Sequence, residues 1–209
     1  MEMKKYLLPF VALLLSFGAQ AASYSDGKEF VSLKKTVQDA PPVLEFFSFY
    51  CPSCYQYDEV MKVADSVKKK LPSGVTLTQY HASFMGPLGE DLTHAWSVAK
   101  LLQVEDKVKP LMFEAVQKNR SVNTVDDIRA VFEKAGVNAS DFDAAWNSFA
   151  VKSLTAKQNA MAQAVELSGV PAMFVKGQYQ VNPKGLNTQD VSAFVTHFAE
   201  TVDYLLTTR

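Results

Sequence analysis

The stretch VLEFFSFYCPSCYQY, residues 43–57, joins an apolar run to a pair of closely spaced cysteines. Its first half, Val43–Phe49, is almost continuously aliphatic and aromatic, which is typical of a central strand buried on both faces. Cys51 and Cys54 follow, and they are the only cysteines in the chain. From Tyr55 onward, apolar residues recur at helical spacing, so one continuous helix is expected up to the Pro-Ser-Gly that follows them. These apolar residues are Val60, Val63, Ala64, Val67 and Leu71.

The position of the cysteines at the start of a helix gives them reactivity. With C-x-x-C spacing, Cys51 lies near the N-cap and Cys54 lies one turn into the helix, while Pro52 occupies a first-turn position where its missing N–H costs nothing. Unpaired backbone N–H groups and the helix dipole stabilise a thiolate at Cys51 and lower its pKa. A lower thiolate pKa favours the reduced pair, which makes the disulfide a stronger oxidant. We therefore expect Cys51 to be the exposed sulfur that is attacked and Cys54 to be the buried resolving thiol.

Two other uses of a cysteine pair fit the sequence less well. A structural disulfide across so short a loop gains little chain entropy. A zinc site needs about four ligands, and the chain offers these two cysteines with His81, His94 and His197 scattered along it. Redox chemistry is therefore the favoured interpretation, and we predict neither a metal ion nor another cofactor.

The composition is that of an ordinary globular protein. The chain has 209 residues, of which 48% are hydrophobic, and a formal net charge of −1. This length suits one compact domain with a possible insertion. A net charge so close to zero provides no electrostatic basis for binding nucleic acid or an anionic membrane surface.

The N-terminus has the pattern of an export signal. Lys4 and Lys5 precede the mostly apolar run Leu7–Phe17, and Ala19-Gln20-Ala21 then fits a cleavage site. The run is too short to span a bilayer comfortably, so we predict a secretory signal peptide over residues 1–21. An uncleaved anchor is the alternative. Export implies an oxidising compartment in which a cysteine pair can exist as a disulfide.

The remaining segments complete an α/β protein. The patterns predict a strand over 75–81, helices over 85–149, a long helix ending near Gly169, a hairpin over 170–181 and a final helix over 188–206. The final helix is expected to place Val191, Phe194 and Phe198 on its core face. This order predicts a mixed sheet interrupted by a helical insertion of about 65 residues.

Five stretches together resemble one known family. They are VLEFFSFYCPSCYQY, VKKKLPSGV, FMGPLGEDLTHAW, DAAWNSFAVKSL and GVPAMFVKGQYQVNP. With them the sequence resembles the DsbA family of bacterial periplasmic thiol:disulfide oxidants over essentially the whole chain after the signal peptide. The resemblance implies a thioredoxin fold with an inserted helical subdomain. Residues 22–83 and 151–209 would form the two parts of the thioredoxin-like domain, and residues 84–150 would form the insertion.

The resemblance also implies a substrate site and partners. Pro171 would be a cis-proline facing the disulfide, and Val170 before it would pair with the substrate backbone by strand addition. The substrates would be reduced, unfolded polypeptides newly exported to the periplasm. A DsbB-type, quinone-linked membrane oxidase would reoxidise the cysteine pair. We expect the protein to act as a monomer.

The chain departs from the family pattern at two positions. The usual dipeptide between the cysteines is Pro-His, whereas this chain has Pro52-Ser53. A serine cannot add positive charge beside the thiolate, so we hypothesise that this chain is a weaker oxidant than Pro-His relatives. The family also carries a lysine on the strand after the active-site helix, paired with a buried glutamate. Here the glutamate is Glu45, and the matching position is Gln79.

Two carboxylates near the cysteines have open interpretations. Glu45 lies in the apolar strand and would relay protons to or from Cys54, with its pKa raised by burial. The alternative is a strand-end glutamate with solvent access or a local hydrogen bond. Asp58 lies in the active-site helix, where it would either tune the thiolate or be an ordinary solvated carboxylate.

Three functions follow from these patterns. The first is an enzyme that donates its disulfide to exported proteins. The second is a dithiol reductase or isomerase, although isomerases of this compartment usually need a dimerisation domain and no segment of this chain looks like one. The third is a peptide-binding chaperone in which the thiols are incidental.

Overall fold

The structure is a computed structural model that describes residues 24–208. The signal peptide predicted for residues 1–21 lies outside the described residues. Within them, five strands form one mixed sheet in the order β1-β5-β4-β2-β3. The strands are β1 (Phe30–Ser32), β2 (Val43–Phe47), β3 (Leu77–His81), β4 (Ala172–Val175) and β5 (Tyr179–Val181).

The strand that leads to the cysteines lies inside the sheet. β2 pairs with β3 in parallel and with β4 in antiparallel orientation. All five residues of β2 are buried, as the apolar run predicted. The strand ends at Phe47 rather than Phe49, because the chain turns there and the N–H of Cys51 donates to the carbonyl of Ser48.

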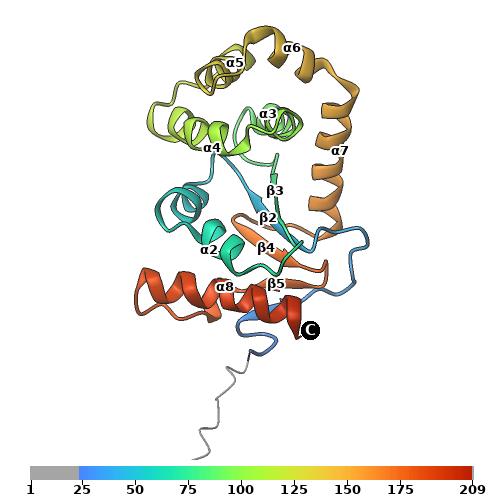
Figure 1. Cartoon of the computed structure of the whole chain (residues 1–209), viewed down its shortest axis with the longest axis vertical. Coiled ribbons are helices and arrows are strands. Elements are labelled where there is room, and N and C mark those ends of the chain that lie inside the picture. The colour runs from blue at the N-terminus through green and yellow to red at the C-terminus, as the bar shows by residue number, and fades with distance from the viewer. Residues whose placement is uncertain (1–23, 209) are drawn as a thin grey trace, which may run out of the picture.

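Helices cover both faces of the sheet and one of its ends (Figure 1). The helices are α1 (Pro52–Tyr55), α2 (Val63–Lys70), α3 (Gly89–Leu102), α4 (Glu105–Phe113), α5 (Val125–Lys134), α6 (Ala139–Asn147), α7 (Phe149–Ala164) and α8 (Val191–Thr207). Two π-helical segments, η1 (Gln56–Val60) and η2 (Glu114–Lys118), and one 3₁₀ segment, η3 (Pro183–Gly185), complete them. None of the helices within residues 24–208 is long and apolar enough to cross a membrane.

The hydrophobic core has three parts. Helices α2 and α8 pack on one face of the sheet around Val43 and Phe198. The end of α7 covers the other face, where Met161 contacts the cluster of Leu44 and Phe46. Helices α3 to α6 enclose a third cluster, which also includes the two cysteines at the end of β2. The insertion therefore packs directly against the active-site helix.

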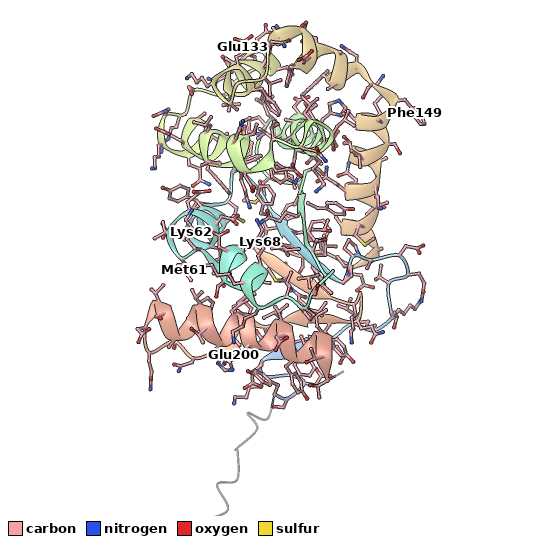
Figure 2. All side chains as sticks on the ribbon, viewed as in Figure 1. Met61, Lys62, Lys68, Glu133, Phe149 and Glu200 are labelled. Atoms are coloured by element: carbon pink, nitrogen blue, oxygen red, sulfur yellow. The ribbon has the colours of Figure 1, made fainter. Side chains whose placement is uncertain are left out.

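The predicted continuous helix after the cysteines is wrong. α1 passes into the π-helical segment η1, and the chain then breaks at Lys62, which has a left-handed φ of 56° before α2 begins; Figure 2 labels Met61 and Lys62 at this break. A π-helix holds more residues per turn than an α-helix, so it shifts which side chains face the core. As a result Val60 is 57% exposed, whereas the predicted apolar face would have buried it.

Two helix predictions need smaller corrections. The long helix ends at Ala164 rather than near Gly169. The final helix begins at Val191, capped by the side chain of Asp190, and Val191 is exposed rather than on the core face. The first turn of this helix extends past the edge of the core, so an apolar residue in that turn stays exposed. Helical spacing alone does not show where the core ends.

Candidate active site

The two cysteines lie where the strand meets the first helix. Cys51 is the N-cap residue of α1, and Pro52 occupies the first helical position. The Cys51 sulfur accepts a hydrogen bond from the backbone N–H of Cys54 at 3.2 Å. Cys54 is fully buried, as predicted. The prediction of an exposed Cys51 is wrong, because this residue is only 3% exposed.

The environment separates the acidities of the two thiols. Hydrogen bonds from the Cys54 thiol and from the backbone N–H groups of Cys54 and Ser53 lower the pKa of Cys51 to about 7, against the opposing effects of burial and of the Asp58 charge. Burial, the hydrogen bond to Cys51 and the charges of Cys51 and Glu45 raise the pKa of Cys54 far above that of an ordinary thiol. Cys51 is therefore the thiolate near neutral pH, and Cys54 retains its proton.

Val170 and Pro171 lie against the reactive sulfur. The peptide bond between them is cis, in agreement with what the resemblance implied. In its protonated form, the Cys51 thiol donates a hydrogen bond to the carbonyl oxygen of Val170 at 3.3 Å. The segment that precedes β4 thus covers Cys51, which explains the low exposure of this sulfur.

Two further side chains fix the backbone around Cys51, and nothing in the sequence indicated either of them as a site residue. The amide of Gln117 in η2 donates to the carbonyl oxygens of Phe49 and Cys51, at 2.8 and 2.9 Å. His81 at the end of β3 accepts a hydrogen bond from the N–H of Phe49 at 3.0 Å. The turn that presents Cys51 is therefore anchored both to the sheet and to the insertion.

His81 is held in one neutral form. Its Nε2 accepts from Phe49, so Nδ1 carries the proton and donates to the Thr93 hydroxyl at 2.8 Å. That hydroxyl in turn donates to the carbonyl of Gly89. Burial and the nearby charge of Lys109 lower the pKa of His81 to about 3. His81 is thus a fixed acceptor and not a proton carrier near neutral pH.

A buried polar cluster lies beneath the cysteines. Glu45 and Gln79 face each other across β2 and β3, and the Gln79 amide donates to both Glu45 and Asp58. Lys109 from α4 completes the cluster, with its Nζ 2.8 Å from Asp58 Oδ2. Glu45 and Asp58 are 1% and 7% exposed, so the alternatives in which either one is solvated are wrong.

Burial sets the acidity of both carboxyl groups. Burial and the charge of Asp58 raise the pKa of Glu45 to about 7, although Lys109 and the Gln79 hydrogen bond oppose this. Burial also raises the pKa of Asp58, while its direct ion pair with Lys109 lowers it. Glu45 can therefore gain or lose a proton near neutral pH, as a proton carrier requires.

The sequence contained no signal for Lys109 in this cluster. Val108 and Met112 mark the apolar face of α4, and a lysine next to them normally points to solvent. Among residues 24–208, no group of three or more His, Cys, Asp or Glu side chains is arranged to hold a metal ion.

Comparisons with known proteins identify similar sequences and a matching family. A family model described as a DSBA-like thioredoxin domain matches residues 42–199. The thiol:disulfide interchange proteins DsbA of Salmonella typhimurium and of Escherichia coli K12 are each 55% identical to this chain over 204 residues. The alignment covers 98% of this chain and 99% of the Salmonella protein, and 97% and 98% for the E. coli protein.

A solved structure gives the same result for the fold. The DsbA of Proteus mirabilis, in complex with a non-covalently bound peptide, is 43% identical and superposes with a TM-score of 0.87. The match covers 88% of this chain and 99% of the Proteus chain. The expected thioredoxin fold is confirmed.

Proposed function

Because this chain belongs to the family of DSBA-like thioredoxin domains, we propose that it donates its Cys51–Cys54 disulfide to reduced polypeptides. The chain is a thiol:disulfide oxidoreductase. The direction of transfer is supported by one observation above all, the opposite shifts of the two thiol pKa values. A stabilised Cys51 thiolate favours the reduced pair, so the oxidised pair tends to pass its disulfide on.

The reaction consists of two thiol–disulfide exchanges. A substrate thiolate attacks the Cys51 sulfur, forms a mixed disulfide and breaks the Cys51–Cys54 bond. The second substrate thiolate then attacks the substrate sulfur of that mixed disulfide and expels Cys51 as a thiolate. The substrate loses two electrons and gains a disulfide, and the Cys51–Cys54 pair gains the two electrons. The low pKa of Cys51 makes it a good leaving group in the second step.

The first exchange leaves Cys54 as a thiolate in a buried site. Its raised pKa means that this thiolate takes up a proton at once. Glu45 acts on Cys54 electrostatically, and its pKa of about 7 makes it a suitable donor. In our proposal the Glu45 carboxylic acid protonates Cys54, becomes a carboxylate and later recovers a proton from solvent. Asp58 tunes Glu45 and Cys51 through its charge, whereas Pro52 and Ser53 shape the helix start.

Val170 and Pro171 form the proposed contact with the substrate backbone. Their position is suitable, because the Val170 carbonyl lies 3.3 Å from the sulfur that the substrate attacks. The peptide bound to the Proteus protein supports a peptide ligand for this chain as well. A substrate that pairs with this segment would bring its own cysteine to Cys51.

The proposed setting is the periplasm, reached through the signal peptide over residues 1–21. We propose a DsbB-type membrane oxidase as the reoxidising partner, a monomeric state, and the division into 22–83, 84–150 and 151–209. Each of these rests on the family and on the sequence patterns.

The test uses reduced, unfolded ribonuclease as the client and matched variants of the two cysteines. The oxidised wild type should form client disulfides stoichiometrically, Cys51→Ala should form none, and Cys54→Ala should accumulate a mixed disulfide at Cys51 when it is presented with an oxidised client. If the wild type only rearranged scrambled ribonuclease, the isomerase alternative would replace the proposal. If Cys51→Ala lost oxidative folding but suppressed client aggregation as well as the wild type does, the chaperone alternative would replace the proposal.

A further inference from the structure

Lys109 is an unusual residue for its position. It belongs to the helical insertion, yet it is only 7% exposed. Its Nζ lies 2.8 Å from Asp58 Oδ2 and 4.2 Å from the centroid of the Phe47 ring. A buried ammonium group is costly unless it is paired. Lys109 is paired with the carboxylate of Asp58, so it affects which of the nearby carboxyl groups carries a proton.

We propose that Lys109 is a positioning residue that keeps Asp58 ionised and thereby places the single proton of the buried cluster on Glu45. This inference rests on the proposed function, in which Glu45 protonates Cys54.

The buried cluster contains more carboxyl groups than cations. The cluster holds one cation, Lys109, and two carboxyl groups, Glu45 and Asp58, joined by the neutral amide of Gln79. With both carboxyl groups ionised, a net negative charge would remain among side chains that are almost fully buried. Such a charge is avoided by protonating one of the two groups. Near neutral pH the cluster therefore favours one carboxylate and one carboxylic acid.

The contacts decide which group carries the proton. Asp58 contacts the ammonium group directly, at 2.8 Å, so its ionised form is stabilised most. Glu45 has the Gln79 amide as its hydrogen-bond donor. An amide is neutral and stabilises a carboxylate less than a cation does. The proton therefore belongs on Glu45, the group that also acts on Cys54.

Other charged groups around the cluster are farther out or act on both carboxyl groups. Glu59 lies on the same segment as Asp58 and opposes its ionisation, whereas Lys68 on α2 favours the ionisation of both carboxyl groups. Lys68 is partly exposed and forms a 4.0 Å ion pair with Asp106. Tyr57 and Cys54 lie on the Glu45 side.

A polar cavity gives the cluster a route to solvent. The cavity has a volume of about 300 Å³, and Asp58, Gln79, Lys68 and Lys109 are among the residues that line it. It opens on the Lys109 side of the cluster, whereas Val170 marks the substrate side of Cys51. Proton exchange with solvent can therefore occur while a substrate covers Cys51.

The test locates the proton directly by a ¹³C NMR titration of the Asp58 and Glu45 carboxyl groups in the reduced protein. In the wild type, Asp58 should ionise at lower pH than Glu45. In Lys109→Met, the Asp58 midpoint should rise by at least one pH unit, which is a tenfold weaker acid, and Lys109→Arg should restore it. Lys68→Met is the matched control, since Lys68 lines the same cavity and lies on α2 (Figure 2), and it should move the midpoint by less than one third of a unit.

A second variant is informative if Lys109→Met does not fold. Asp58→Asn removes the competing charge, so Glu45 should then ionise at least one pH unit lower.

The proposal is overturned if Glu45 ionises before Asp58 in the wild type, if Lys109→Met leaves the Asp58 midpoint in place, or if Asp58→Asn leaves Glu45 unchanged. The titrations require no disulfide transfer. A protein that failed to oxidise ribonuclease but showed the expected order of midpoints would refute the proposed function and leave the role of Lys109 standing.

Discussion

Replacing Glu45 with glutamine should stabilise the reduced protein above neutral pH. Glu45 is buried inside the sheet, and its pKa is raised from 4.5 to about 7. The folded protein therefore retains a proton that the unfolded chain releases between these two pH values. In that window the free energy of unfolding of the wild type falls as the pH rises.

The size of the effect follows from the pKa values. One pH unit corresponds to about 1.4 kcal/mol, so the rise to about 7 corresponds to about 3 kcal/mol once the pH exceeds 7. A glutamine is similar in shape, and its carbonyl oxygen can still accept the hydrogen bond from the Gln79 amide. Glu45→Gln should therefore resemble the wild type in stability at pH 4 and exceed it by about 3 kcal/mol at pH 8.

Urea denaturation of the reduced protein between pH 4 and pH 8 measures this difference. Glu133→Gln serves as the control, since Glu133 is an exposed residue on α5, at the far end of the insertion (Figure 2). The control should follow the wild type at every pH. Parallel curves for Glu45→Gln and the wild type would mean that Glu45 does not carry its proton in the folded state at neutral pH.

Two further substitutions test the surroundings of Cys51. Ser53→His places a cation at an exposed position of the helix start, and it should lower the Cys51 pKa by about half a unit and make the pair more oxidising. Thiolate absorbance at 240 nm measures the Cys51 pKa, and Ser53→Asn is the neutral control. Equal pKa values in the two variants would contradict our hypothesis on Ser53. Gln117→Ala leaves the carbonyls of Phe49 and Cys51 without their amide donor, and it should lower the free energy of unfolding by about 1–3 kcal/mol. The exposed Gln56→Ala should leave it unchanged, and an equal loss in both variants would contradict an anchoring role for Gln117.

The parts of the fold that depend on local pattern were predictable. The run from Val43 to Phe47 was apolar throughout and forms a fully buried strand. Cys51 and Pro52 indicated where the helix begins, because an N-cap and a first-turn proline are local features of the sequence. These features were sufficient to identify the reactive pair.

The parts that depend on distant contacts were not predictable. The π-helical segment η1 turns Asp58 inward, and it does so against Lys109, a residue 51 positions along the chain that belongs to another element. Helical spacing assumes a regular α-helix and assigned the faces of this segment incorrectly. Gln117 likewise meets Cys51 only because the insertion folds back over the active-site turn.

The equilibrium reduction potential of the Cys51–Cys54 pair, measured in a glutathione buffer series, shows whether the surroundings of Cys51 favour the reduced pair. About 30 mV corresponds to 1.4 kcal/mol for this two-electron couple. We predict a value less negative than about −200 mV, more oxidising than that of thioredoxin at about −270 mV. A value near that of thioredoxin would mean that the pair holds its disulfide rather than donates it, and the proposed direction of transfer would then be wrong.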